Sequence, residues 1–267
     1  MPTSVHVTVW HQAGPEAPPV VLIHGSMTWG TACFEKQRPL AESYRLLVMD
    51  RRGYGSSPDI ERSDYDVDTA DVIELLGDRA HVVGHSYGGV VAMLAAARCP
   101  EAVRSLALIE PAAFGAAAAH PAVAAALRRM REAVASIPAD PSPATYLRLS
   151  AEAMGTPRPE LSPDRLRAAR TALLERPSWD AEIPLEPLAS AAWPKLVING
   201  TWETAAPAYR AWIGEAMTAC GAIVAERIGG ALLRVPGAAH EPHREQPALV
   251  NPVLRDLWKN GDQWPVL

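Results

Sequence analysis

Residues 80–89 read Ala-His-Val-Val-Gly-His-Ser-Tyr-Gly-Gly, and residues 90–98 that follow are good helix formers. The apolar residues at the start predict a short strand, so the Gly-x-Ser-x-Gly sequence at 84–88 stands at a sharp turn between a strand and a helix. The two flanking glycines remove the Cβ atoms that would collide around a strained central residue. The turn is therefore expected to lift the Ser86 hydroxyl above the edge of a sheet, a position typical of a nucleophile.

Three further segments have the form of strands that lead into functional loops. Residues 19–25 form an apolar run ending in His-Gly, and residues 45–57 form another that continues as Asp-x-Arg-Gly-x-Gly-x-Ser. Residues 231–240 form a late apolar run, a Pro-Gly turn and a histidine. With the turn around Ser86, and in this order, these segments resemble the α/β-hydrolase superfamily, in particular an esterase- or lactonase-like branch with a serine nucleophile and a helical cap. The motifs are specific for the fold and say little about the substrate.

The apolar runs predict an α/β fold with a mostly parallel sheet of about seven to eight strands flanked by helices. They fall at residues 5–10, 20–24, 45–50, 80–83, 104–109, 195–199 and 231–235. Between residues 112 and 192 the alternation of strand and helix stops, and a stretch rich in Ala, Pro and Arg predicts three or four helices. The resemblance implies a cap in this place. We therefore expect a core of residues 1–111 and 193–267 and a helical cap of residues 112–192.

Composition excludes several classes of function. The chain has 267 residues, 48% of them hydrophobic, and a net charge of −5 without any basic run, which argues against nucleic-acid binding. Its apolar runs are too short to cross a membrane, and the N-terminus lacks the pattern of a signal peptide. The three cysteines lack the spacing of a disulfide framework or a metal motif, which favours a reducing, cytoplasmic setting. The scarcity of lysine beside many Arg, Ala and Pro suggests a bacterial coding sequence.

A serine hydroxyl is a poor nucleophile unless a base lies within hydrogen-bond distance of it. We expect His240 to be this base because it follows a strand and a Pro-Gly turn near the end of the chain. His243, three residues later on the same loop, is the main competitor. His85 is adjacent to Ser86 but should point away from it, and His24 is expected to hold loop backbone in place.

Two glutamates compete for the role of the carboxylate that orients the histidine. Glu203 follows a predicted strand as Gly200-Thr-Trp-Glu203, which is the usual pattern of the family. Glu110 ends an earlier predicted strand directly, a position from which some branches, including zearalenone-type lactonases, take their acid. The sequence leaves both open, and we lean toward Glu110 because the connection from Glu203 to His240 is long.

The resemblance also assigns supporting roles. The backbone N–H groups of Ser26 and Tyr87 would form an oxyanion hole, which stabilises the negative charge that develops on a reacting carbonyl oxygen. Four bulky side chains are expected to line a largely apolar substrate pocket: Trp29, Tyr146, Met154 and Trp179. The sequence contains no phosphate-binding loop, dinucleotide fingerprint or metal motif, so we expect neither a cofactor nor a metal.

Together these features predict a cofactor-independent serine hydrolase with a Ser-His-Glu triad that cleaves a carboxylic ester or lactone of a small, largely apolar molecule. An acyl-enzyme would form on Ser86 and then be hydrolysed. The expected partner is the small-molecule substrate alone, with neither nucleic acid nor membrane. One alternative is hydrolysis of a carbon–carbon bond in a β-diketone, or of a thioester. Another is a non-catalytic small-molecule receptor on the same fold.

Overall fold

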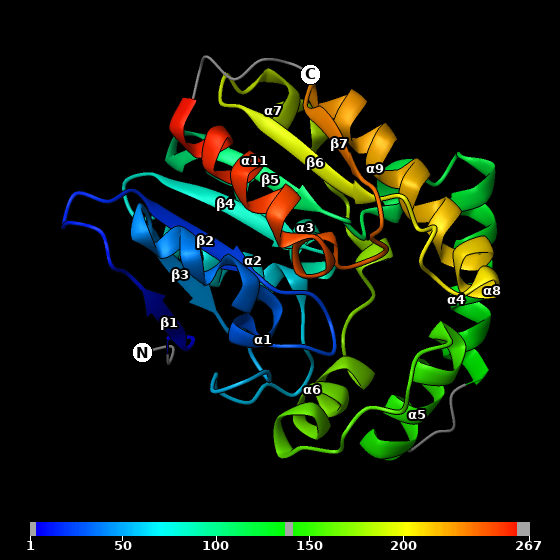
Figure 1. Ribbon diagram of the computed structural model, residues 1–267. Coiled ribbons are helices and arrows are strands. Elements are labelled where there is room, and N and C mark those ends of the chain that lie inside the picture. Colours follow the sequence, from blue (N-terminus) through cyan, green and yellow to red (C-terminus); the bar gives the residue numbers. More distant parts are fainter. Residues whose placement is uncertain (1–3, 137–140, 261–267) are drawn as a thin grey trace.

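The computed structural model describes residues 4–136 and 141–260, which form a twisted sheet with helices on both faces (Figure 1). The sheet has seven strands in the order β1-β3-β2-β4-β5-β6-β7. The strands are β1 (Val7–Trp10), β2 (Pro19–Ile23), β3 (Arg45–Met49), β4 (Ala80–His85), β5 (Val103–Ile109), β6 (Lys195–Gly200) and β7 (Ala231–Val235). Only β1 runs antiparallel, against β3, and each other pair in this sheet is parallel. The expected mostly parallel α/β sheet is confirmed.

The central strands are apolar on both faces because helices cover both. In β2, Val21 and Ile23 face one hydrophobic cluster, whereas Val20 and Leu22 face the other. This alternation is the period of two that a strand imposes on its side chains. The strands therefore read as continuous apolar runs rather than as an alternation of apolar and polar residues.

Two groups of helices supply the covering layers. Apolar residues of α2 (Tyr65–Leu76), α3 (Tyr87–Arg98) and α9 (Glu215–Ile228) join the first cluster. Those of α1 (Gly30–Phe34) and α11 (Pro247–Asn260) join the second. Within the described ranges, no helix combines the length and hydropathy that a membrane crossing requires.

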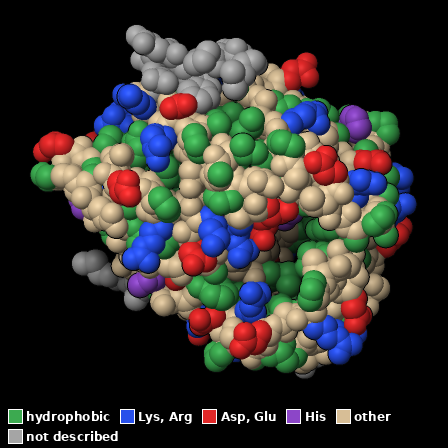
Figure 2. Space-filling view, in the orientation of Figure 1, with side chains coloured by type: hydrophobic (Ala, Val, Ile, Leu, Met, Phe, Trp, Pro, Cys, Tyr) green, Lys and Arg blue, Asp and Glu red, His purple; other side chains and the backbone are tan. Residues whose placement is uncertain are grey.

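A helical segment is inserted between β5 and β6. Its helices are α4 (Pro121–Ser136), α5 (Pro143–Met154), α6 (Pro163–Leu173) and α7 (Leu185–Ser190). The hydroxyls of Ser142 and Ser162 cap α5 and α6 by accepting hydrogen bonds from backbone N–H groups, and a proline follows each cap. In Figure 1, α5 and α6 stand apart from the sheet, on the side toward which the parallel strands point. The molecular surface is hollowed in the corresponding part of Figure 2.

Shorter elements complete the described chain. They are two helical turns, α8 (Pro207–Tyr209) and α10 (Pro242–Glu245), a π-helical turn (Arg210–Gly214), and four 3₁₀ segments (Glu35–Glu42, Pro100–Ala102, Phe114–Ala117 and Ser178–Asp180). The loops after β2, β4, β5, β6 and β7 all leave the same edge of the sheet because these strands are parallel. That edge is where open α/β sheets bind their ligands.

The turn after β4 packs too closely to admit a side chain at its first glycine. A Cβ atom at residue 84 would lie 2.3 Å from the Gly88 carbonyl oxygen. We expect Gly84→Ala to lower the free energy of unfolding by about 1–3 kcal/mol, because backbone has to shift to relieve the overlap. Gly14→Ala is the control, since no atom lies within 4 Å of the added methyl group there. Urea denaturation measures both, and equal midpoints for the two variants would contradict the close packing.

Candidate functional site

Ser86 lies at the junction of β4 and α3 with φ 54° and ψ −117°, a backbone conformation that non-glycine residues rarely adopt. Its carbonyl oxygen accepts hydrogen bonds from the N–H groups of Gly89 and Ala112, and its own N–H donates to the Ile109 carbonyl. These bonds hold the strained residue from both sides, so the turn anticipated from the glycines is present and fixed.

His240 approaches Ser86 from the loop after β7. Its Nε2 lies 3.0 Å from Ser86 Oγ, within hydrogen-bond distance. Its Nδ1 lies 3.7 Å from Oε2 of Glu110, and the imidazole is 30% exposed. The second separation is longer than a hydrogen bond, and such contacts in ligand-free sites commonly tighten when substrate binds. The structure thus brings together one hydroxyl, one imidazole and one carboxylate.

Glu110 immediately follows β5, at φ 44°, and is fully buried. Its Oε1 accepts three hydrogen bonds, from Asn199 Nδ2 at 3.0 Å, the Gly200 N–H at 2.7 Å and Trp202 Nε1 at 3.2 Å. Its Oε2 has no hydrogen-bond partner among the described residues and faces His240. Because one oxygen carries all three bonds, the other is left free to orient the imidazole.

Glu203, the other glutamate considered from the sequence, does not reach the histidine. It is exposed, and its Oε1 accepts a hydrogen bond of 2.7 Å from the Gly237 N–H. The contact joins the loop after β6 to the turn after β7. The geometry gives Glu203 a bracing contact between two loops and places Glu110 beside His240.

Trp202 is a site residue that the sequence pattern did not single out. It has φ 62° and is 1% exposed, and its ring packs against Tyr209 and His240 with centroids 5.6 and 5.9 Å away. Its indole N–H is one of the three donors to Glu110. In the sequence, only the position of Trp202 next to Glu203 in the Gly-Thr-Trp-Glu motif points to a role in the site.

The loop after β2 lies against the nucleophile turn. A Cβ atom at Gly25 would stand 2.9 Å from Ser86 Cβ, so Ser26 is close to the reactive hydroxyl in space. The Ser26 hydroxyl donates to a carboxylate oxygen of Glu175, a residue of the inserted segment. Tyr87 begins α3, and its hydroxyl donates to the Arg176 carbonyl at 3.1 Å. Both residues expected at the oxyanion hole are therefore tied to the inserted segment by their side chains.

Arg51 forms a buried charge network with the same segment. Its guanidinium donates to Asp68 at 2.9 Å and to Glu175 at 2.7 Å and lies over the rings of Tyr54 and Tyr87. Burial raises the pKa of Asp68 to about 6, although Arg51 acts in the opposite direction. Sequence analysis missed this network because its partners lie 17 and 124 residues from Arg51.

Three other histidines considered from the sequence form hydrogen bonds with backbone groups rather than with Ser86. His243 is fully buried, with Nε2 3.1 Å from the Cys33 carbonyl oxygen, so it does not compete with His240 for Ser86. His85 donates from Nε2 to the His240 carbonyl at 2.9 Å. His24 accepts from the Arg51 N–H and donates to the Gly25 carbonyl, the loop-holding contacts anticipated for it.

The four side chains expected to line a pocket are half-buried: Trp29, Tyr146, Met154 and Trp179. Trp29 precedes α1, and Tyr146 and Met154 lie on α5. Burial raises the pKa of the Tyr146 phenol, and the negative charge of Glu175 raises it further. Trp179 packs against the hydrophobic cluster beneath the inserted segment. Their contact with a substrate stays a prediction.

Comparison with known proteins independently supports the resemblance to the α/β-hydrolases. The family model described as the alpha/beta hydrolase family matches residues 20–253. An uncharacterized carboxylesterase of Bacillus subtilis is 35% identical over 107 residues, which cover 38% of this chain and 36% of that protein. A pimeloyl-[acyl-carrier protein] methyl ester esterase of Aeromonas salmonicida is 36% identical over 93 residues, 34% of this chain and 37% of that protein. Each alignment thus spans little more than a third of the relative's own length.

Solved structures match over nearly the whole chain. A thermophilic esterase from Thermogutta terrifontis has a TM-score of 0.67 at 23% identity and covers 94% of this chain and 92% of its own. A 2-hydroxy-6-oxo-6-phenylhexa-2,4-dienoate hydrolase from Rhodococcus has a TM-score of 0.66 at 20% identity, covering 96% and 100%. An N-acyl homoserine lactone degrading enzyme has a TM-score of 0.60 at 19% identity, covering 94% and 95%. At these identities the likeness shows the fold alone.

The hydrogen bond from the Trp202 indole to Glu110 can be tested by mutation. We expect Trp202→Phe to lower the free energy of unfolding by about 1.5–3 kcal/mol, because it removes a hydrogen bond to a buried charged group. Trp212→Phe is the matched control, since the indole N–H of Trp212 has no hydrogen-bond partner among the described residues. Thermal and urea unfolding measure both variants. Equal losses would mean that ring volume, rather than the bond to Glu110, accounts for the effect.

Proposed function

Because the chain belongs to the alpha/beta hydrolase family, we propose that it is a cofactor-independent serine hydrolase that cleaves a carboxylic ester or a lactone of a small, largely apolar molecule. One observation carries the proposal: Ser86 Oγ lies 3.0 Å from His240 Nε2, while Nδ1 of the same ring faces the buried carboxylate of Glu110. A nucleophile, a base and an orienting acid in this relation are the components of acyl transfer through a covalent intermediate.

In the proposed reaction, Ser86 Oγ attacks the substrate carbonyl while His240 Nε2 accepts the hydroxyl proton. Glu110 Oε2 holds the Nδ1–H tautomer and stabilises the imidazolium that forms. His240 then passes the proton to the departing alcohol, which leaves an acyl group on Ser86. A water molecule, activated by the same imidazole, attacks this ester and releases the acid.

The backbone N–H groups of Ser26 and Tyr87 are proposed to bind the developing oxyanion, each with about 3 kcal/mol of transition-state stabilisation. Tyr87 supports this role because it is the first residue of α3, where N–H groups lack partners within the helix. Ser26 supports it because its loop packs against Ser86, and its hydroxyl bond to Glu175 restrains that loop.

The choice of ester or lactone rests on the relatives. Two of the curated relatives bear the names of a carboxylesterase and a methyl ester esterase. The structural neighbours include an esterase, a lactone-degrading enzyme and a dienoate hydrolase, so the fold alone does not choose among these bonds. A non-catalytic receptor is disfavoured because it has no need of a base at hydrogen-bond distance from a strained serine.

The apolar character of the substrate follows from the proposed pocket. Residues 112–192 would act as a cap, with Tyr146 and Met154 on α5 and Trp179 further along, and Trp29 would contribute from the core. Aromatic and thioether side chains favour apolar ligands over ionic ones. A panel of nitrophenyl esters and lactones of increasing acyl length would define the preference.

The nucleophile is tested by Ser86→Ala. Because the change removes one small hydroxyl, we expect hydrolysis of nitrophenyl esters to fall by at least 10³-fold while the thermal unfolding midpoint stays nearly unchanged. A fluorophosphonate probe should label the wild-type chain covalently and leave the variant unlabelled, as judged by intact mass. Activity within tenfold of wild type, or labelling of the variant, would refute the mechanism.

The acid is tested by comparing Glu110→Gln with Glu203→Gln. The first variant places an amide opposite Nδ1 and favours the wrong imidazole tautomer, so kcat should fall by about 10³-fold or more with KM nearly unchanged. The second keeps an oxygen that can accept from the Gly237 N–H, so its kcat should stay within a few-fold of wild type. The reverse ranking would assign the acid to Glu203.

A further inference from the structure

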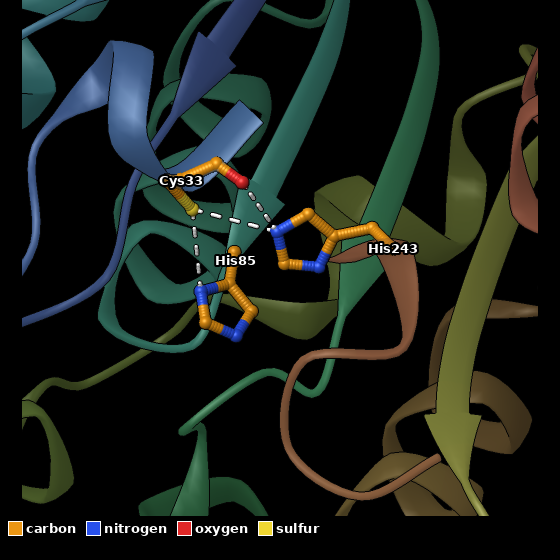
Figure 3. Close-up of side chains that lie close together, drawn as sticks. All are labelled: Cys33, His85 and His243. Atoms are coloured by element: carbon orange, nitrogen blue, oxygen red, sulfur yellow. Dashed lines mark hydrogen bonds between the residues drawn. The ribbon is translucent and has the colours of Figure 1, made fainter. Parts of the chain in front are cut away.

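A second group of reactive side chains lies beside the proposed triad and supplies none of its three residues. Cys33 on α1, His85 at the end of β4 and His243 on α10 point toward one another (Figure 3). Cys33 Sγ is 3.6 Å from His85 Nδ1 and 3.5 Å from His243 Nε2, and the three atoms all lie within 4.8 Å of one another. The side chains are buried, so any ion held between them would be enclosed by protein.

Both imidazoles can present a lone pair to this space. His85 donates from Nε2 to the His240 carbonyl, which leaves its Nδ1 unprotonated and directed at the sulfur. His243 Nε2 donates to the Cys33 carbonyl in this structure, so binding an ion requires the proton to move to Nδ1, which has no partner among the described residues.

The spacing suits a small thiophilic cation. An ion bound about 2.3 Å from sulfur and about 2.0 Å from nitrogen holds the two atoms about 3.5 Å apart at a tetrahedral angle and about 3.7 Å apart at the 120° angle of a three-coordinate ion. The two sulfur–nitrogen separations in the cluster, 3.6 and 3.5 Å, agree with these values to within about 0.2 Å. One thiolate and two imidazoles are a donor set that selects copper or zinc over harder ions.

Charge decides between these two metals. A thiolate with a monovalent ion makes a neutral complex, whereas a divalent ion leaves a net positive charge in a buried site. The nearby carboxylate of Glu241 is held by Arg244 at 2.8 Å and does not offset that charge freely. A monovalent ion also needs no fourth ligand from the protein.

We propose that Cys33 Sγ, His85 Nδ1 and His243 Nε2 bind one Cu(I) ion. The thiol loses its proton to solvent as the copper–sulfur bond forms, and the oxidation state of copper does not change. The ion cross-links three chain segments, two of which carry Ser86 and His240, without using either residue as a ligand.

The test is an anaerobic competition for Cu(I) with the coloured chelator bicinchoninate. Wild-type protein should withdraw one equivalent per chain, and its thermal unfolding midpoint should rise by several degrees. Cys33→Ser and His243→Gln should each weaken Cu(I) binding at least tenfold. The glutamine amide can still donate to the Cys33 carbonyl, so it preserves the hydrogen bond while it removes the ligand. Cys220→Ala, which removes another buried thiol, should bind as wild type does.

Three outcomes would overturn the proposal. If the wild-type protein leaves the chelator colour unchanged, the cluster does not bind Cu(I) and only forms hydrogen bonds within the fold. Equal Cu(I) binding by wild type and Cys33→Ser would show capture by other thiols. Cys33-dependent binding of Zn²⁺ without binding of Cu(I) would refute the charge argument. Cu(I) binding and thermal unfolding are measured without hydrolase activity. Failure of this proposal and failure of the proposed function can therefore be told apart.

Discussion

The buried carboxylate of Glu110 is the constraint around which the site is arranged. A carboxylate removed from water costs several kcal/mol unless hydrogen bonds replace its hydration. The protein supplies three donors from β6 and the loop after it, all to one oxygen. To deliver them, Trp202 adopts a positive φ, and Asn199 packs so closely on α9 that a Cβ atom at Gly221 would lie 1.8 Å from its side-chain oxygen.

The loops at this edge are held by contacts that cross long stretches of sequence. His85 supports the backbone of His240 from a position 155 residues earlier, and Glu203 links the loop after β6 to Gly237. The inserted segment joins the same edge through Glu175, which reaches both Ser26 and Arg51. Contacts from many segments of the chain therefore hold Ser86 and His240 in place, and catalysis depends on such precise positioning.

Much of the fold could be predicted because its strands are apolar on both faces and its turns carry glycine. All seven apolar runs correspond to strands, and the serine turn lies where the Gly-x-Ser-x-Gly sequence places it. The choice between Glu110 and Glu203 could not be made from pattern. It depends on the direction in which Trp202 and Asn199 donate, and no local periodicity encodes this. The burial of His243 and its approach to Cys33 across 210 residues were equally invisible.

The contacts of Glu175 limit how freely the inserted segment can be exchanged. If residues 121–190 were replaced by the helices of another hydrolase, Arg51 would keep only Asp68 as a carboxylate partner, and the Ser26 hydroxyl would lose its acceptor. The buried guanidinium and the Tyr54 hydroxyl would then each lose the hydrogen-bond acceptor that Glu175 supplies. In protein engineering terms the segment is not an independent module. A chimaera designed to change specificity has to retain an acidic side chain at position 175 or redesign Arg51 with it.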